Sequence, residues 1–160
     1  MAIHLVLVAA PMLYATYTDL KDMRIPNIAS LILIGIFVVT APFLFGWSEI
    51  GMRLGIAFGV LVITFILNAM GHIGGGDAKL FAAAALFIPP ELEGWFPFLL
   101  IVGITGVVAL LVHRRAQASV YVQARAGHWR SFTEKKHFPY GIAISLGLIL
   151  YLALSLIGRI

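Results

Sequence analysis

The sequence predicts an all-α, polytopic membrane protein with about six transmembrane helices. Hydrophobic residues make up 61% of the 160 residues and charged residues only 11%, whereas soluble domains contain about 25% charged residues. A chain of this composition cannot bury its apolar side chains in one aqueous core, so lipid must be the solvent for most of it. Six apolar stretches and an uneven distribution of lysine and arginine complete the prediction.

Each apolar stretch approaches the length of about 20 residues that a helix needs to cross the hydrocarbon core. In chain order, the predicted segments span residues 3–17, 28–45, 50–70, 78–88, 95–112 and 140–157. The breakers that separate them are Pro26-Asn27, Gly46, 71–76, Pro89-Pro90 and Pro139. The first segment lacks the basic region and the small-residue cleavage site of a signal peptide, so we predict a retained helix there.

The fourth segment is shorter than the others and cannot span the membrane by itself. A glycine-rich stretch, 71–76, comes directly before it. Irregular backbone at membrane depth is tolerated only where protein buries it or a water-filled cavity meets it. We therefore expect a short fourth helix with a glycine-rich lead-in at membrane depth.

The distribution of lysine and arginine predicts the orientation in the membrane. If the loop after the first helix is cytoplasmic, six helices put both termini outside and nine of the 11 basic residues on the cytoplasmic side. These nine are Lys21, Arg24, Lys79, Arg114, Arg115, Arg125, Arg130, Lys135 and Lys136. Only Arg53 and Arg159 fall on the other side. Three carboxylates are expected to be solvated charges of the outer loops: Glu49, Glu91 and Glu93.

Two aspartates are the main candidates for chemistry, because acidic residues within or beside membrane segments are costly and usually functional. Asp19 closes the first segment and Asp77 opens the fourth, so both should lie at the cytoplasmic ends of their helices. Two carboxylates that face one water can share a proton, one acting as general base and the other as proton donor. Spacing alone leaves another interpretation open, in which Asp77 caps the fourth helix and Asp19 merely ends the first. Asp22 is expected to be a solvated interfacial charge.

The remaining residue types favour no metal, cofactor or nucleic-acid site. The chain has no cysteine, and its five histidines lack the spacing of a His-Glu-x-x-His zinc site. The basic stretch 114–136 is too short to predict nucleic-acid binding, but it can attract anionic lipid headgroups. We therefore expect membrane lipid, and no nucleic acid, among the partners.

Two segments around the aspartates resemble the signature segments of the type IV prepilin peptidases. In the first, five residues separate Asp19 from Ile25-Pro26-Asn27, and the second reads Gly74-Gly75-Gly76-Asp77-Ala78-Lys79. Pro139-Tyr140-Gly141 is similar to a Pro-Tyr-Gly that recurs in that family. The order and spacing of the helices agree as well, so the resemblance covers essentially the whole chain.

The resemblance implies a GxGD-type aspartic endopeptidase of the cytoplasmic membrane that needs no metal. Such enzymes remove the leader peptide of prepilins and pseudopilins at the cytoplasmic face, in pilus biogenesis and protein secretion. Asp19 and Asp77 match the catalytic aspartates. The residues expected to shape the site or bind substrate are Gly74, Gly75, Gly76, Lys79, Pro26 and Asn27.

Without cysteines, the chain lacks the paired CxxC motifs that accompany N-methylation in larger family members. We therefore expect one membrane-embedded peptidase domain over residues 1–160 and no methyltransferase segment, as in the short members that serve Flp/Tad-type pili. Archaeal preflagellin peptidases share the aspartate motifs and remain open. So do a small proton-coupled transporter that uses the same aspartates and an assembly subunit with a decayed site. Lys79 could steady an aspartate, contact the substrate backbone or extend to water.

Overall fold

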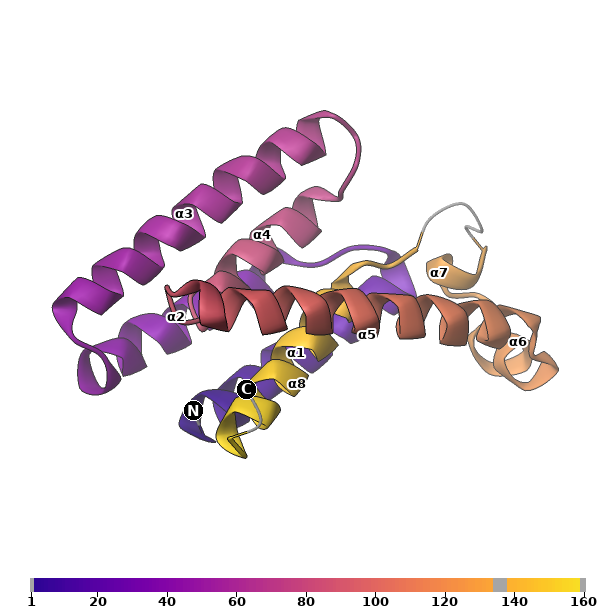
Figure 1. Cartoon of the computed structure of the whole chain (residues 1–160). Helices are drawn as coiled ribbons and strands as arrows, with labels where there is room; N and C mark the ends of the chain where they lie inside the picture. The colour runs from indigo at the N-terminus through magenta and orange to yellow at the C-terminus, as the bar shows by residue number, and fades with distance from the viewer. Residues whose placement is uncertain (1, 134–137, 159–160) are drawn as a thin grey trace.

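The computed structural model describes residues 2–133 and 138–158, and all secondary structure in these ranges is α-helical (Figure 1). The helices are α1 Ala2–Asp22, α2 Asn27–Leu44, α3 Trp47–Ala69, α4 Gly75–Ala85, α5 Leu92–Ala118, α6 Val120–Ala126, α7 Arg130–Thr133 and α8 Gly141–Leu156. The predicted all-α class is confirmed. Lys135, Lys136 and Arg159, to which the sequence assigned a side of the membrane, lie outside the described residues.

Each of the six predicted apolar segments forms a helix, but the helices differ in length. Within the described part of the chain, α1, α2, α3 and α5 are long and apolar enough to cross a membrane. The other two are shorter, with 11 residues in α4 and 16 in α8. The protein is therefore a helical membrane protein, while the number of six spans and the N-out/C-out topology remain predictions. Helix α5 runs past its predicted end at residue 112, and α6 and α7 follow within the basic stretch.

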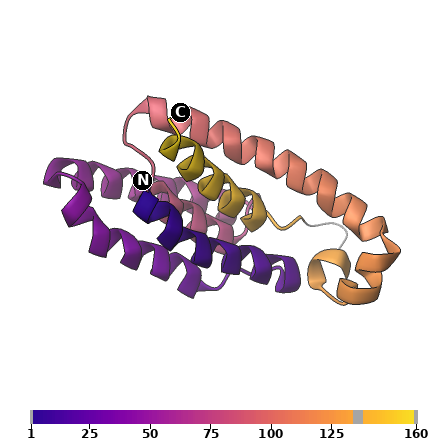
Figure 2. The same ribbon diagram turned by 90° about the horizontal axis from the view of Figure 1, so that it is seen from below.

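Helix α8 packs between α1 and α5, as the view from below shows (Figure 2). Helix α4 lies at the centre of the molecule, where it contacts α2, α3 and α8. The short helix α7 folds back onto α1. This arrangement brings the beginnings of α4 and α8 to the end of α1.

The core is formed around α4, and the outer helices expose apolar surface. Most side chains between Ala78 and Ile88 are buried, and the four alanines at 82–85 let neighbouring helices approach closely. Helices α3 and α5 instead expose large apolar side chains such as Phe58 and Val107. Exposed apolar surface of this extent marks a surface that lipid or a partner covers.

Helix α1 continues beyond its predicted end at residue 17 and places Asp19 inside its last turn. The backbone N–H of Met23 donates a hydrogen bond of 3.0 Å to the carbonyl of Asp19. Met23 has a φ of 52°, the left-handed conformation that commonly terminates helices but is uncommon for residues other than glycine. The chain then turns through an extended Pro26, which is the N-cap of α2.

Arg53 and Glu49 differ from the prediction that treated them as charges outside the helices. Both belong to α3, and the Arg53 side chain is only 2% exposed. Its Nη1 donates to the carbonyls of Leu86 and Ile88 at 3.1 and 2.9 Å. Its Nη2 lies 2.7 Å from Oε1 of Glu49. Arg53 thus satisfies carbonyls that the end of α4 leaves without helical partners, a role that charge counting along a sequence cannot detect.

Candidate active site

Asp19 is buried at the junction of α1 and α8. Its side chain belongs to the last turn of α1, and the residue is 6% exposed. The backbone N–H of Gly141, the first residue of α8, donates a hydrogen bond of 2.8 Å to Oδ2 of Asp19. The first N–H groups of a helix have no helical acceptor, so the beginning of α8 is suited to bind a carboxylate.

Only glycine fits at position 141 without a change in its surroundings. A Cβ atom there would lie 2.6 Å from Cδ1 of Ile25 and 2.8 Å from Oδ2 of Asp19. The sequence pointed to Gly141 only through the Pro-Tyr-Gly likeness and gave it no place in the site. That motif was the signal that could have identified it.

Asp77 is the third residue of α4, and it is not the N-cap as the helix-capping interpretation required. The N-cap is Gly74, and no side chain caps the helix. Oδ2 of Asp77 turns back toward the backbone of Gly74, where the N–H meets the carboxylate and a Cβ atom would lie 2.7 Å from Oδ2. Among the described residues, buried Oδ1 of Asp77 has no hydrogen-bond partner. A buried polar atom without a partner is rare and is suited to bind water or substrate.

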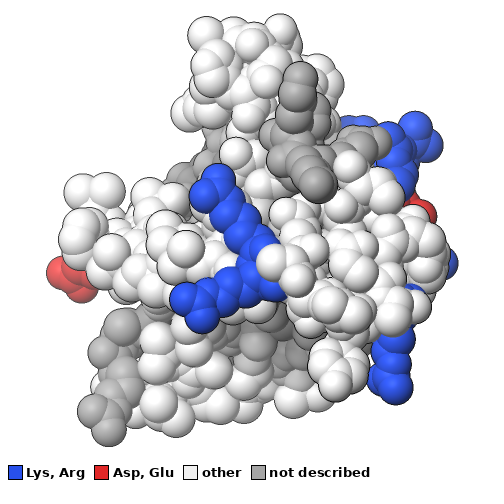
Figure 3. Space-filling view, turned by 90° about the vertical axis from the view of Figure 1, so that its right-hand side faces the viewer, with Lys and Arg blue, Asp and Glu red and all other residues white. Residues whose placement is uncertain are grey.

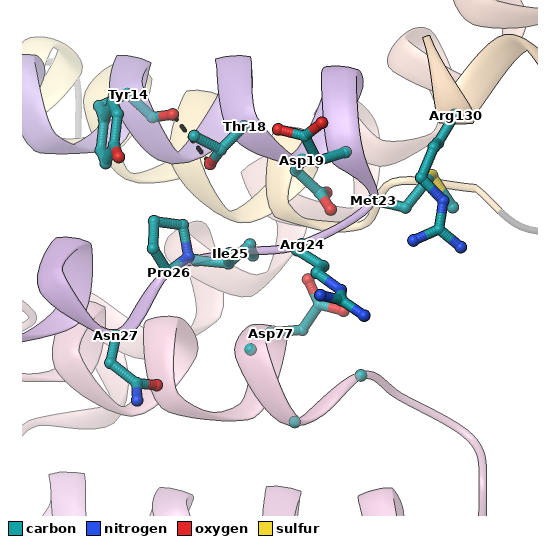
Figure 4. A pocket seen from close by; sticks show the side chains of 14 residues that line it. Tyr14, Thr18, Asp19, Met23, Arg24, Ile25, Pro26, Asn27, Asp77 and Arg130 are labelled. Carbon is teal, nitrogen blue, oxygen red and sulfur yellow. Dashed lines mark hydrogen bonds between the residues drawn. The ribbon is translucent and has the colours of Figure 1, made fainter.

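The two aspartates line one pocket of about 790 Å³ at the same end of the molecule (Figure 4). Asp19 points into it from α1, and Asp77 points into it from the beginning of α4. The two carboxylates are close enough for their charges to repel each other. Two carboxylates that repel in one pocket favour a state in which they share a proton.

Most of the other predicted site residues line the same pocket. Pro26 and Asn27 contribute from the turn into α2, and Gly74, Gly75 and Gly76 from the lead-in to Asp77. The glycines are not equivalent. A Cβ atom at Gly76 would lie 3.0 Å from Cβ of Ile25, whereas one at Gly75 would have no neighbour closer than 3.7 Å.

Lys79 does not line the aspartate pocket. It is exposed, and its Nζ donates a hydrogen bond of 3.0 Å to Oδ1 of Asn27. This bond links the Gly-Asp segment of α4 to the Pro-Asn segment before α2. Of the roles left open by the sequence, the contact fits a connection between the two motifs better than a direct contact with an aspartate.

Three charged residues at the pocket had no predicted role in the site. Asp22 and Arg24 come from the end of α1 and the turn after it, and Arg130 comes from α7. All three are exposed, which agrees with the expected solvated position of Asp22. Arg130 reaches the pocket because α7 packs on α1, a tertiary contact that its basic sequence surroundings did not indicate.

Together these features define a class: a helical membrane protein with two converging carboxylates in a polar pocket at one end of its helices. The model of the type IV leader peptidase family matches residues 6–111. The chain belongs to the type IV leader peptidase family, and the predicted family membership is confirmed. The matched range includes both aspartates and Lys79 and ends before Gly141. No curated protein and no solved structure matches the chain.

Proposed function

We propose that the protein is an aspartic endopeptidase that removes the leader peptide of type IV prepilin-like proteins, with Asp19 and Asp77 as its catalytic pair. The observation that carries the proposal is that both aspartates, 58 positions apart in the sequence, line the same pocket. Membership in the leader peptidase family supports the reaction and the substrate class. The proposed form is a single peptidase domain without methyltransferase activity.

The carboxylates suit activation of a water molecule. Each has one oxygen turned to backbone, Asp19 to Gly141 and Asp77 to Gly74. The second oxygens remain available to a water between them. The unprotonated aspartate takes a proton as the water oxygen attacks the scissile carbonyl carbon, and the protonated one donates to the carbonyl oxygen. Collapse of the tetrahedral intermediate returns a proton to the leaving amine. Because the proton belongs to the pair, neither role is assigned to one residue.

The position of the basic residues supports cleavage at the cytoplasmic face of the cytoplasmic membrane. Figure 3 views the end of the molecule that carries α6 and α7, where Lys and Arg side chains project and few acidic side chains are visible. Arg24 and Arg130 line the aspartate pocket at this end. Excess Lys and Arg marks cytoplasmic loops, so the aspartates would face the cytoplasm.

The test is cleavage of a co-expressed prepilin-like protein in membranes, with the new N-terminus identified by mass spectrometry. We expect the wild type to remove the leader, and Asp19→Asn and Asp77→Asn each to lower the rate by about 10²–10⁴-fold at equal abundance in the membrane. Glu93→Gln, an exposed carboxylate on α5 outside the pocket, is the matched control and should cleave like the wild type. Normal processing by either Asn variant would rule out the pair. Proton flux into liposomes without any cleavage would instead favour the transporter.

A further inference from the structure

A second cleft, of about 660 Å³, lies between α3 and α5. In Figure 1 these helices diverge toward the end that carries α6 and α7, while α4 and α8 lie behind the gap. Thr64 and Leu67 of α3 form one wall, and Gly103, Gly106 and Val107 of α5 form the other. Phe81, Ala143 and Ile144 are the main apolar residues at its base.

The cleft is continuous with the candidate active site through Asp77, which lines both cavities. Asp77 is therefore the place where a polar pocket and an apolar cleft meet. Its buried Oδ1 has no partner among the described residues, so a chain lying in the cleft can reach an oxygen that no protein group occupies.

The walls of the cleft belong to two of the candidate membrane spans, α3 and α5. Both helices carry exposed large apolar side chains along their length, so the gap between them opens sideways into lipid. A soluble peptide would have to leave water to enter it, whereas an apolar helix in the bilayer can enter without being dehydrated.

Small residues give a helix room to approach. A Cβ atom at Gly103 would meet nothing within 4 Å, and one at Gly106 would meet only Cβ of Ala143 at 3.4 Å. Association of helices in membranes depends on such small residues, because they let backbones pack closely.

Building on the proposed function, we infer that the α3–α5 cleft binds the apolar transmembrane segment of the substrate. The segment enters from the bilayer between α3 and α5, and its polar end brings the scissile bond to Asp77. The leader itself then lies in the polar pocket that Asp19 and Asp77 share. Recognition of the apolar segment is thereby separated from cleavage and is located on different helices.

Because the chain contains no cysteine, disulfide mapping can test this position directly. Val107→Cys and Leu67→Cys place a thiol on each wall of the cleft. Val108→Cys and Ile66→Cys are matched controls, since they are exposed neighbours on the same helices that do not line the cleft. Val107 and Val108 are 60% and 52% exposed, so accessibility alone predicts equal reaction.

The variants are made in an Asp19→Asn background that retains uncleaved substrate, with one cysteine in the substrate's apolar segment. After oxidation of membranes with copper–phenanthroline, we expect adducts at 107 and 67 and at least tenfold fewer at 108 and 66. A kinetic arm uses Gly103→Leu in the otherwise wild-type protein. It should raise KM for the full-length substrate on the order of tenfold, about the factor given by one wrong contact. Gly55→Leu, on open surface of α3, should leave KM unchanged.

The outcomes separate the two proposals. If the wild type cleaves no prepilin-like substrate, the proposed function fails. If the wild type cleaves but adducts form equally at the cleft and control positions, the cleft is not the substrate site and lipid occupies it. A KM for Gly103→Leu equal to that of Gly55→Leu would overturn the inference in the same way.

Discussion

The backbone N–H of Gly141 lies 2.8 Å from Oδ2 of Asp19, a hydrogen bond that joins positions 122 residues apart. It fixes the beginning of α8 against the last turn of α1. One oxygen of Asp19 is thereby held in place, and the orientation of the carboxylate follows from the packing of two helices. The contact connects the Pro-Tyr-Gly motif to the aspartate that begins the first signature segment.

Replacement of Gly141 by alanine should impair cleavage without removing either aspartate. The new Cβ would lie within 2.8 Å of both Asp19 and Ile25, so α8 or the carboxylate must move. Displacements of about 1 Å can cost on the order of 100-fold in rate. We expect a loss of that size in kcat. Gly35→Ala, in α2 with nothing within 4 Å of the new Cβ, should keep the wild-type rate. Equal rates for the two variants would show that the Gly141 contact does not position the site.

The adjacent glycines 75 and 76 should differ in their tolerance of alanine. At Gly76 a Cβ would press against Ile25 at 3.0 Å, while at Gly75 the nearest atom is 3.7 Å away. Overpacking of this kind costs about 1–3 kcal/mol and here pushes the beginning of α4 away from the turn before α2. Gly76→Ala should therefore lose cleavage, and Gly75→Ala should retain it. Prepilin processing in membranes at matched expression decides the comparison, and the opposite order would contradict the packing of Gly76 on Ile25.

Lys79 and Asn27 should act as one unit. Their hydrogen bond of 3.0 Å is exposed, and bonds to charged groups contribute about 1.5–3 kcal/mol at most, with solvent lowering that value here. We expect Lys79→Ala, Asn27→Ala and the double variant to lower kcat/KM by similar, severalfold amounts. Strictly additive losses in this double-mutant cycle would show that Lys79 acts through a partner other than Asn27.

Arg53 should matter for stability rather than for chemistry. Removal of its side chain leaves the carbonyls of Leu86 and Ile88 buried without their donor, at about 1–3 kcal/mol for each unsatisfied group. Arg53→Met should lower the thermal unfolding temperature in detergent. Arg125→Met, an exposed arginine of α6, should not. An unchanged melting temperature for Arg53→Met would mean that the end of α4 does not depend on this contact.

The sequence predicted the elements better than their ends. Apolar composition located all six helices, because lipid requires long apolar segments whose backbone groups are satisfied internally. Hydropathy does not determine where α1 stops, since the end depends on the left-handed conformation of Met23, which no residue-type rule favours for methionine. The predicted end at residue 17 was therefore five residues short of Asp22.

The site was predicted in its residues but not in its contacts. The aspartate segments were visible because each lies within a short, local pattern. Gly141 and Arg130 reach the pocket only through the packing of α8 and α7 on α1, and a single sequence carries no signal for such long-range pairing. Arg53 was misplaced for the same reason, since its acceptors lie 33 and 35 residues away.

The short length of α4 bears on how the protein responds to membranes of different thickness. Eleven residues give a helix of about 16 Å at 1.5 Å per residue, roughly half of the ~30 Å hydrocarbon layer. Spanning helices follow a thicker or thinner bilayer by tilting. Helix α4 is held by Arg53 at its end and by Ile25 at its beginning, so protein contacts alone set its depth. The distance between Asp77 and Asp19 should thus be insulated from lipid composition, which suits an enzyme whose substrate arrives with its own hydrophobic length.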